Sequence, residues 1–115
     1  MKKDTSAIGA ICESIEKSVG NIDGGLMTGD EVSGFISGIE KKLDKLTVHA
    51  QETYDMMPPA KKRGNDGELT EEYISNLEDI CAYVSDIAEN YKENGDITGV
   101  TDNLEEVMEM LEDLL

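Results

Sequence analysis

Apolar residues along this chain recur every three or four positions, and they do so in four separate segments. In the first segment, for example, Ile8, Ile11 and Ile15 follow this spacing. An α-helix turns once every 3.6 residues, so the spacing places the apolar side chains of each segment on one helix face. The pattern predicts four amphipathic helices. They cover residues 5–19, 28–57, 70–93 and 99–114.

Residues that start and stop helices separate the first two segments. Gly20 can adopt the left-handed conformation that ends a helix, so we expect the first helix to stop there. Thr28 and Glu31 have the spacing of a capping box, which predicts a helix beginning at Thr28. The pair Pro58–Pro59 should end this second helix, because the residue before a proline disfavours the helical conformation.

The last two helices follow a polar stretch. Residues 60–67 are expected to form an exposed linker, and Thr70 is expected to cap the third helix. No segment alternates apolar and polar residues as a half-buried strand does. Short connections between long amphipathic helices favour antiparallel neighbours. The sequence therefore predicts one all-α domain over residues 1–115, an antiparallel four-helix bundle-like fold with a long central hairpin of residues 28–57 and 70–93.

The charge of the chain is strongly asymmetric. Of 115 residues, 26 are acidic and 10 are basic, for a formal net charge of −16. Residues 1–63 hold ten acidic and nine basic residues, whereas residues 64–115 hold sixteen acidic residues and one lysine. Such a chain does not attract nucleic acid or an anionic membrane by charge. The sequence also lacks an apolar run of ~18 residues and a signal-peptide core, so we expect a cytoplasmic protein with no direct nucleic-acid or membrane partner.

Motifs for catalysis or metal binding are missing from the sequence. His49 is the only histidine. A histidine that carries a phosphoryl group needs positive charge beside it, and Glu52, three residues later, places negative charge there instead. Cys12 and Cys81 lie on apolar stripes and form no CxxC motif. The glycine-rich loops do not supply oxygen ligands at the positions of a calcium loop. We expect no enzymatic activity, no cofactor and no metal site.

Carboxylates gather opposite the apolar stripe in the last two helices. Six acidic residues of the last helix lie within eleven residue steps, from Asp102 to Asp113. At ~1.5 Å per residue this is roughly one negative charge every 3 Å, comparable to one per ~3.4 Å along a DNA strand. No lysine or arginine interrupts them. Six like-charged pairs three or four residues apart destabilise this helix by about 1 to 3 kcal/mol, which indicates a function beyond solubility.

This arrangement leads to the main functional hypothesis, a non-catalytic inhibitor whose acidic helices occupy the basic, nucleic-acid-binding groove of a partner protein. In size, charge and helicity the chain resembles the small acidic DNA mimics that phages and mobile elements direct against restriction or CRISPR machinery. The resemblance is one of class and rests on no motif. The residues expected to contact the partner are Asp79, Tyr83, Asp86, Glu89, Glu93, Asp102, Glu105, Glu106, Glu109, Met110 and Asp113.

A second hypothesis uses the other half of the chain. Gly34 and Gly38 are expected on the outer face of the 28–57 helix, where a partner backbone could approach closely. Residues 56–64 include Lys61–Arg63, the only concentrated positive charge. These features suit a helical adaptor, chaperone or immunity-type protein. Both hypotheses stay open on the sequence alone, and a homo-oligomer is compatible with either.

Overall fold

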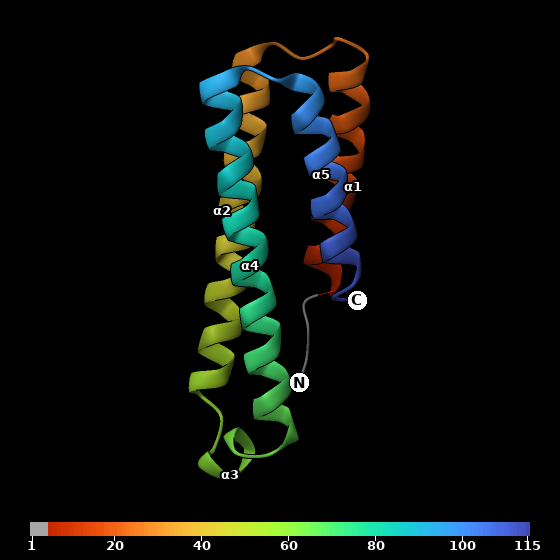
Figure 1. Ribbon diagram of the computed structural model, residues 1–115. Coiled ribbons are helices and arrows are strands. Elements are labelled where there is room, and N and C mark those ends of the chain that lie inside the picture. The colour runs from red at the N-terminus through yellow and green to blue at the C-terminus, as the bar shows by residue number, and fades with distance from the viewer. Residues whose placement is uncertain (1–4) are drawn as a thin grey trace.

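The computed structural model describes residues 5–115, and within them every regular element is an α-helix (Figure 1). This confirms the all-α prediction. Residues 1–4 of the expected domain lie outside the described residues. The five helices of the described part are α1 (Thr5–Asp23), α2 (Gly29–Asp55), α3 (Pro59–Lys62), α4 (Asn65–Asn94) and α5 (Ile97–Glu112).

The long helices pack side by side in a bundle-like arrangement measuring 52 × 24 × 17 Å. Helix α2 packs mainly against α4, and α1 packs mainly against α5. Helix α4 also packs against α5, so the two acidic helices are direct neighbours. Figure 1 shows that α2 and α4 form the longest pair, joined through α3 at one end, and that α1 and α5 accompany only the other part of this pair. No helix of the described chain is long and apolar enough to cross a membrane.

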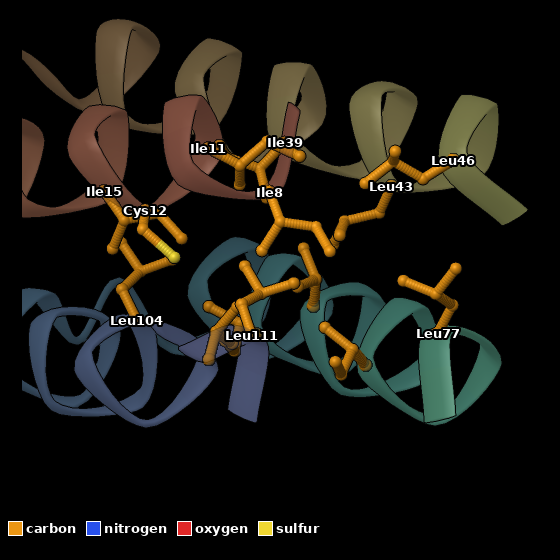
Figure 2. Close-up of a cluster of buried hydrophobic side chains, with 14 of the residues drawn as sticks. Ile8, Ile11, Cys12, Ile15, Ile39, Leu43, Leu46, Leu77, Leu104 and Leu111 are labelled. Atoms are coloured by element: carbon orange, nitrogen blue, oxygen red, sulfur yellow. The ribbon is translucent and has the colours of Figure 1, made fainter. Parts of the chain in front are cut away.

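The core contains the predicted apolar stripes. Ile8 and Ile15 of α1 and Leu104 and Leu111 of α5 are fully buried, and Figure 2 shows them in the same cluster as Leu43 of α2. Fully burying an aliphatic side chain of this size contributes about 1.5–3 kcal/mol. The core therefore offsets the repulsion between carboxylates on the outer faces of the same helices.

Local capping sets the start of α2 where the sequence predicted it. The Thr28 Oγ1 accepts a hydrogen bond from the Glu31 backbone N–H at 3.2 Å, and the Glu31 Oε1 accepts one from the Thr28 N–H at 3.1 Å. This is the reciprocal capping box. The helix ends at Asp55, ahead of the prolines that disfavour its continuation.

The first helix is longer than predicted. Gly20 lies inside α1, which continues to Asp23, and the left-handed glycine is Gly25 with φ of 71°. Ile22 explains the difference, because the extra turn buries this side chain in the core. That burial outweighs the ~1 kcal/mol that a glycine costs inside a helix.

The third long helix begins earlier than predicted. Helix α4 starts at Asn65, so Thr70 is not its cap; Thr70 is buried inside the helix and donates a 2.7 Å hydrogen bond to the Asp66 carbonyl. The preceding segment, expected to be a linker, contains the short helix α3, which packs against α4. Gly67 allows this close approach, because a Cβ at this position would overlap the Lys62 carbonyl.

The turn between α4 and α5 uses two adjacent residues. Gly95 is left-handed, with φ of 64°, and its N–H donates to the Tyr91 carbonyl at 2.8 Å. Asp96 then caps α5 by accepting a 3.2 Å hydrogen bond from the Gly99 N–H. The turn brings the end of α4 directly to the start of α5.

Candidate protein-binding surface on α4 and α5

All nine carboxylates that the sequence assigned to partner binding are exposed to solvent. Four lie on α4 and five lie on α5 or at its C-cap, and the two helices pack against each other. We call this set the acidic surface. It consists of Asp79, Asp86, Glu89, Glu93, Asp102, Glu105, Glu106, Glu109 and Asp113.

Tyr83 joins the two helices that carry the acidic surface. Its hydroxyl lies 3.0 Å from the Asn103 Oδ1 and 2.7 Å from the Glu106 Oε2, so both groups are within hydrogen-bonding distance. Burial raises the pKa of Tyr83 to about 12, and the hydrogen bond to Glu106 adds to the shift. The tyrosine is half-buried and packs against the core. Tyr83 is one of the residues expected to contact a partner, and its hydroxyl is bonded within the chain.

Met110 is also half-buried and packs against the core. The two non-acidic residues expected to bind a partner therefore contribute to the packing of α4 and α5. A binding partner would meet mainly the carboxylates.

The acidic surface is not neutralised by the rest of the described chain. None of its nine carboxylates forms an ion pair with another residue among 5–115. An ion pair of the described part joins Lys61 to Asp66 at 3.7 Å, near α3. On α5 no lysine or arginine stands among the carboxylates, and their negative potential reaches about one Debye length, ~10 Å at 0.1 M salt and ~30 Å at 0.01 M. This surface can attract a basic partner before contact.

The alternative surface on α2 and α3 is less free than the sequence suggested. Gly34 is exposed and a Cβ there would meet nothing within 4 Å, as expected for an outer face. The basic cluster is partly occupied by the chain itself. Lys61 pairs with Asp66, and the ammonium of Lys62 lies 5.2 Å from the centre of the Tyr54 ring. The third cation of the cluster, Arg63, donates a hydrogen bond from its Nε to the Pro59 carbonyl oxygen at 3.3 Å.

The two cysteines are free thiols in different surroundings. Cys12 is buried, and burial raises the pKa of its thiol, with a smaller contribution from Glu112. Burial also raises the pKa of Cys81, against the opposing effect of a hydrogen bond with Thr47. A raised pKa keeps both groups protonated and poorly nucleophilic at neutral pH. Within residues 5–115, no cluster of His, Cys, Asp or Glu side chains could hold a metal ion.

A polar cavity opens between the last turns of α4 and the first turn of α5, and sequence reasoning did not find it. Its volume is about 290 Å³. The sequence does contain one signal for this cavity: several asparagines on the two helices neither continue the apolar stripes nor belong to the acidic faces. The cavity is lined by Ile87, Asn90, Tyr91, Asn94, Asp96, Gly99, Val100 and Asn103.

The chain was compared with protein-family models, with curated proteins and with solved structures. None of the three comparisons found a match.

Proposed function

We propose that this chain is a non-catalytic inhibitor that places its acidic surface in a basic, nucleic-acid-binding groove of a partner protein. It acts as a DNA mimic in the cytoplasm, and an anti-defence protein of a phage or mobile element fits this role. The observation that carries the proposal is the set of nine exposed carboxylates on two adjacent helices, none of them in an ion pair among the described residues.

The proposed scaffold is an antiparallel four-helix bundle-like fold with α2 and α4 as its long central hairpin. A bundle of this kind holds charged side chains on rigid helices, so a partner does not have to order them on binding. From Asp102 to Asp113 the carboxylates extend over ~16 Å, at ~1.5 Å per residue. This is the length of about five phosphates along a DNA strand at ~3.4 Å each.

Charge reversal on α5 tests the proposal. Asp102, Glu105 and Glu109 are exposed, and changing each to Lys leaves the hydrogen bond between Tyr83 and Glu106 in place. Immobilised parent chain should capture a nucleic-acid-binding protein from its native host, and added duplex DNA should compete with that capture. The triple variant should lose the capture.

The matched control reverses three exposed acids outside the acidic surface. Glu13→Lys, Glu16→Lys and Glu52→Lys change the net charge by the same amount. Capture should persist in this control. The proposal is wrong if both triple variants capture equally well, or if the captured protein does not release the chain in the presence of DNA.

The helical adaptor remains a second candidate, favoured by two observations. Met56 beside α3 is 85% exposed, and Gly34 and Gly38 leave open space on the outer face of α2. A partner bound there would be displaced by Gly34→Gln and Gly38→Gln, which the helix itself tolerates because a Cβ at either position meets no other atom. Capture that is sensitive to these changes and insensitive to the α5 reversals would favour the adaptor.

A further inference from the structure

The cavity between α4 and α5 has the chemistry of a site for one cationic side chain. We propose that it is an anchor site for an arginine side chain of the basic partner. The proposal deepens the proposed function and rests on it for the source of the arginine. It adds a defined, directional contact to a surface that otherwise attracts by charge alone.

The polar lining of the cavity is rich in acceptors and contains no lysine or arginine. Asp96 uses its Oδ1 to cap Gly99, and among the described residues no hydrogen bond occupies its second oxygen. The side chains of Asn90 and Asn94 are exposed and make no hydrogen bond to another described residue. A guanidinium group has five N–H donors and no acceptor, so it can use the carboxylate oxygen and the amide oxygens together.

Electrostatics favour a cation over an anion in this cavity. The carboxyl end of α4 and the amino end of α5 meet here, and their dipoles have opposite sign. The side chains therefore decide the local charge. Asp96 is the charged residue of the lining. On the adjoining turns Glu93 and Asp102 are exposed, and the single exposed lysine there, Lys92, leaves the local balance negative. An anion would face these carboxylates without a basic side chain in the lining.

The size and the apolar part of the lining suit a single side chain. A volume of about 290 Å³ lies at or below the lower limit of sites for small organic ligands, which is roughly 300 Å³. Ile87 and Val100 are buried and form the apolar part of the wall, against which the methylene groups of an arginine can pack. The half-buried Tyr91 also borders the cavity and adds aromatic surface to its wall.

A titration with a small arginine analogue tests the site without the partner. Nα-acetyl-arginine methylamide is added to the isotope-labelled full chain, and two-dimensional NMR follows the backbone and side-chain amides. Saturable shifts should concentrate on the side chains of Asn90 and Asn94 and on the Gly99 N–H. The citrulline analogue has almost the same shape but no charge, and it should bind ~10-fold more weakly, the size of one charge-assisted hydrogen bond.

Asp96→Asn separates the charge of the lining from the stability of α5. Asparagine caps helices about as well as aspartate, so the variant keeps the cap and loses the carboxylate. It should weaken binding of the arginine analogue ~10-fold with little change in thermal stability. The matched control is Glu52→Gln, which removes one exposed charge on α2 and should leave binding unchanged.

Three results would overturn the proposal: equal binding of the citrulline analogue, shifts spread evenly over the acidic surface, or equal affinity of Asp96→Asn and Glu52→Gln. A negative result here would leave the proposed function standing if the α5 reversals still abolish capture. Conversely, the chain could bind the arginine analogue saturably while the α5 reversals leave the capture of the partner unchanged. That result would overturn the proposed basic-groove partner and support the arginine site in the cavity.

Discussion

The Tyr83 hydroxyl on α4 lies 2.7 Å from the Glu106 carboxylate on α5, so a residue of the acidic surface is held by the neighbouring acidic helix. The same hydroxyl lies 3.0 Å from the Asn103 side-chain oxygen. The phenol therefore adds a polar contact between α4 and α5 to their packing in the core. Because Glu106 accepts this bond and has no ion pair among the described residues, its position depends on Tyr83.

Tyr83→Phe should lower the free energy of unfolding by about 1 kcal/mol, the usual contribution of one hydrogen bond. The ring still fills its place against the core, so the dependence of the unfolding free energy on urea should keep its slope. Urea denaturation followed by circular dichroism measures both quantities. An unchanged midpoint would show that the hydroxyl does not hold α4 and α5 together.

The same tyrosine predicts a loss of stability at alkaline pH. An unfolded tyrosine loses its proton near pH ~10, whereas burial and Glu106 raise the folded pKa of Tyr83 to about 12. The unfolded state therefore releases the proton first, and the contribution of this group to stability declines as the pH rises from 10 to 12. Below pH ~10 this contribution is fully present.

Denaturation curves at several alkaline pH values measure this loss. Tyr83→Phe has no phenol to titrate at this position, so its stability should decline less over the same range. Phenolate absorbance of the folded parent should contain a late-titrating component that is missing from Tyr83→Phe. Identical pH profiles for the parent and Tyr83→Phe would contradict the assignment of the shift to this residue.

Two glycines on different helices should respond to alanine in opposite directions. At Gly67 a Cβ would overlap the Lys62 carbonyl, so Gly67→Ala must displace α3 from α4 and should destabilise by about 1–3 kcal/mol. At Gly34 a Cβ meets no atom within 4 Å. Gly34→Ala should stabilise by ~0.5–1 kcal/mol, because alanine favours the helix. Thermal unfolding of both variants checks the pair. A Gly67→Ala variant as stable as the parent would show that α3 does not pack against α4 as described, and a destabilised Gly34→Ala would show that Gly34 does not face open space.

These glycines also show which parts of the fold could be predicted from the sequence. The capping box of Thr28 and Glu31 acts over three residues, so local spacing was enough to place the start of α2. Thr70 is a residue type that often caps helices, but the packing of α3 against Gly67 extends α4 by another turn before it. The Thr70 hydroxyl therefore forms its hydrogen bond within the helix. Nothing local to Thr70 signals a contact made by the preceding helix.

Exposure of the acidic residues was predictable for a similar reason. Residues opposite an apolar stripe face solvent whichever neighbour covers the stripe, so helical periodicity alone places Glu105 and Glu109 outside. The bond from Tyr83 and the cavity beside Asp96 depend on which two helices meet and at what register. Periodicity does not contain that information, because Tyr83 and Asn103 lie between the core and the exposed face of their helices.

Salt should stabilise the isolated chain and weaken its attachment to a basic partner. Glu109 has four acidic neighbours, Glu105, Glu106, Glu112 and Asp113, at three or four residues' distance, so repulsion on α5 centres on this residue. Raising NaCl from ~0.05 M to ~0.5 M shortens the Debye length from ~14 Å to ~4 Å, which is below the ~5–6 Å between side chains three or four residues apart on a helix. Relief of about 1 kcal/mol corresponds to a rise in the melting temperature of roughly 4 °C.

Glu109→Lys should remove most of this salt dependence, because the lysine replaces four repulsive pairs with attractive ones. Glu13→Lys is the matched control: it changes the same charge on α1, where Glu13 is exposed and has Lys17 four residues away. Its melting temperature should follow salt as the parent does. Melting curves of the three proteins over a salt series make the comparison, and a parent insensitive to salt would mean that the carboxylates of α5 do not repel one another enough to influence folding.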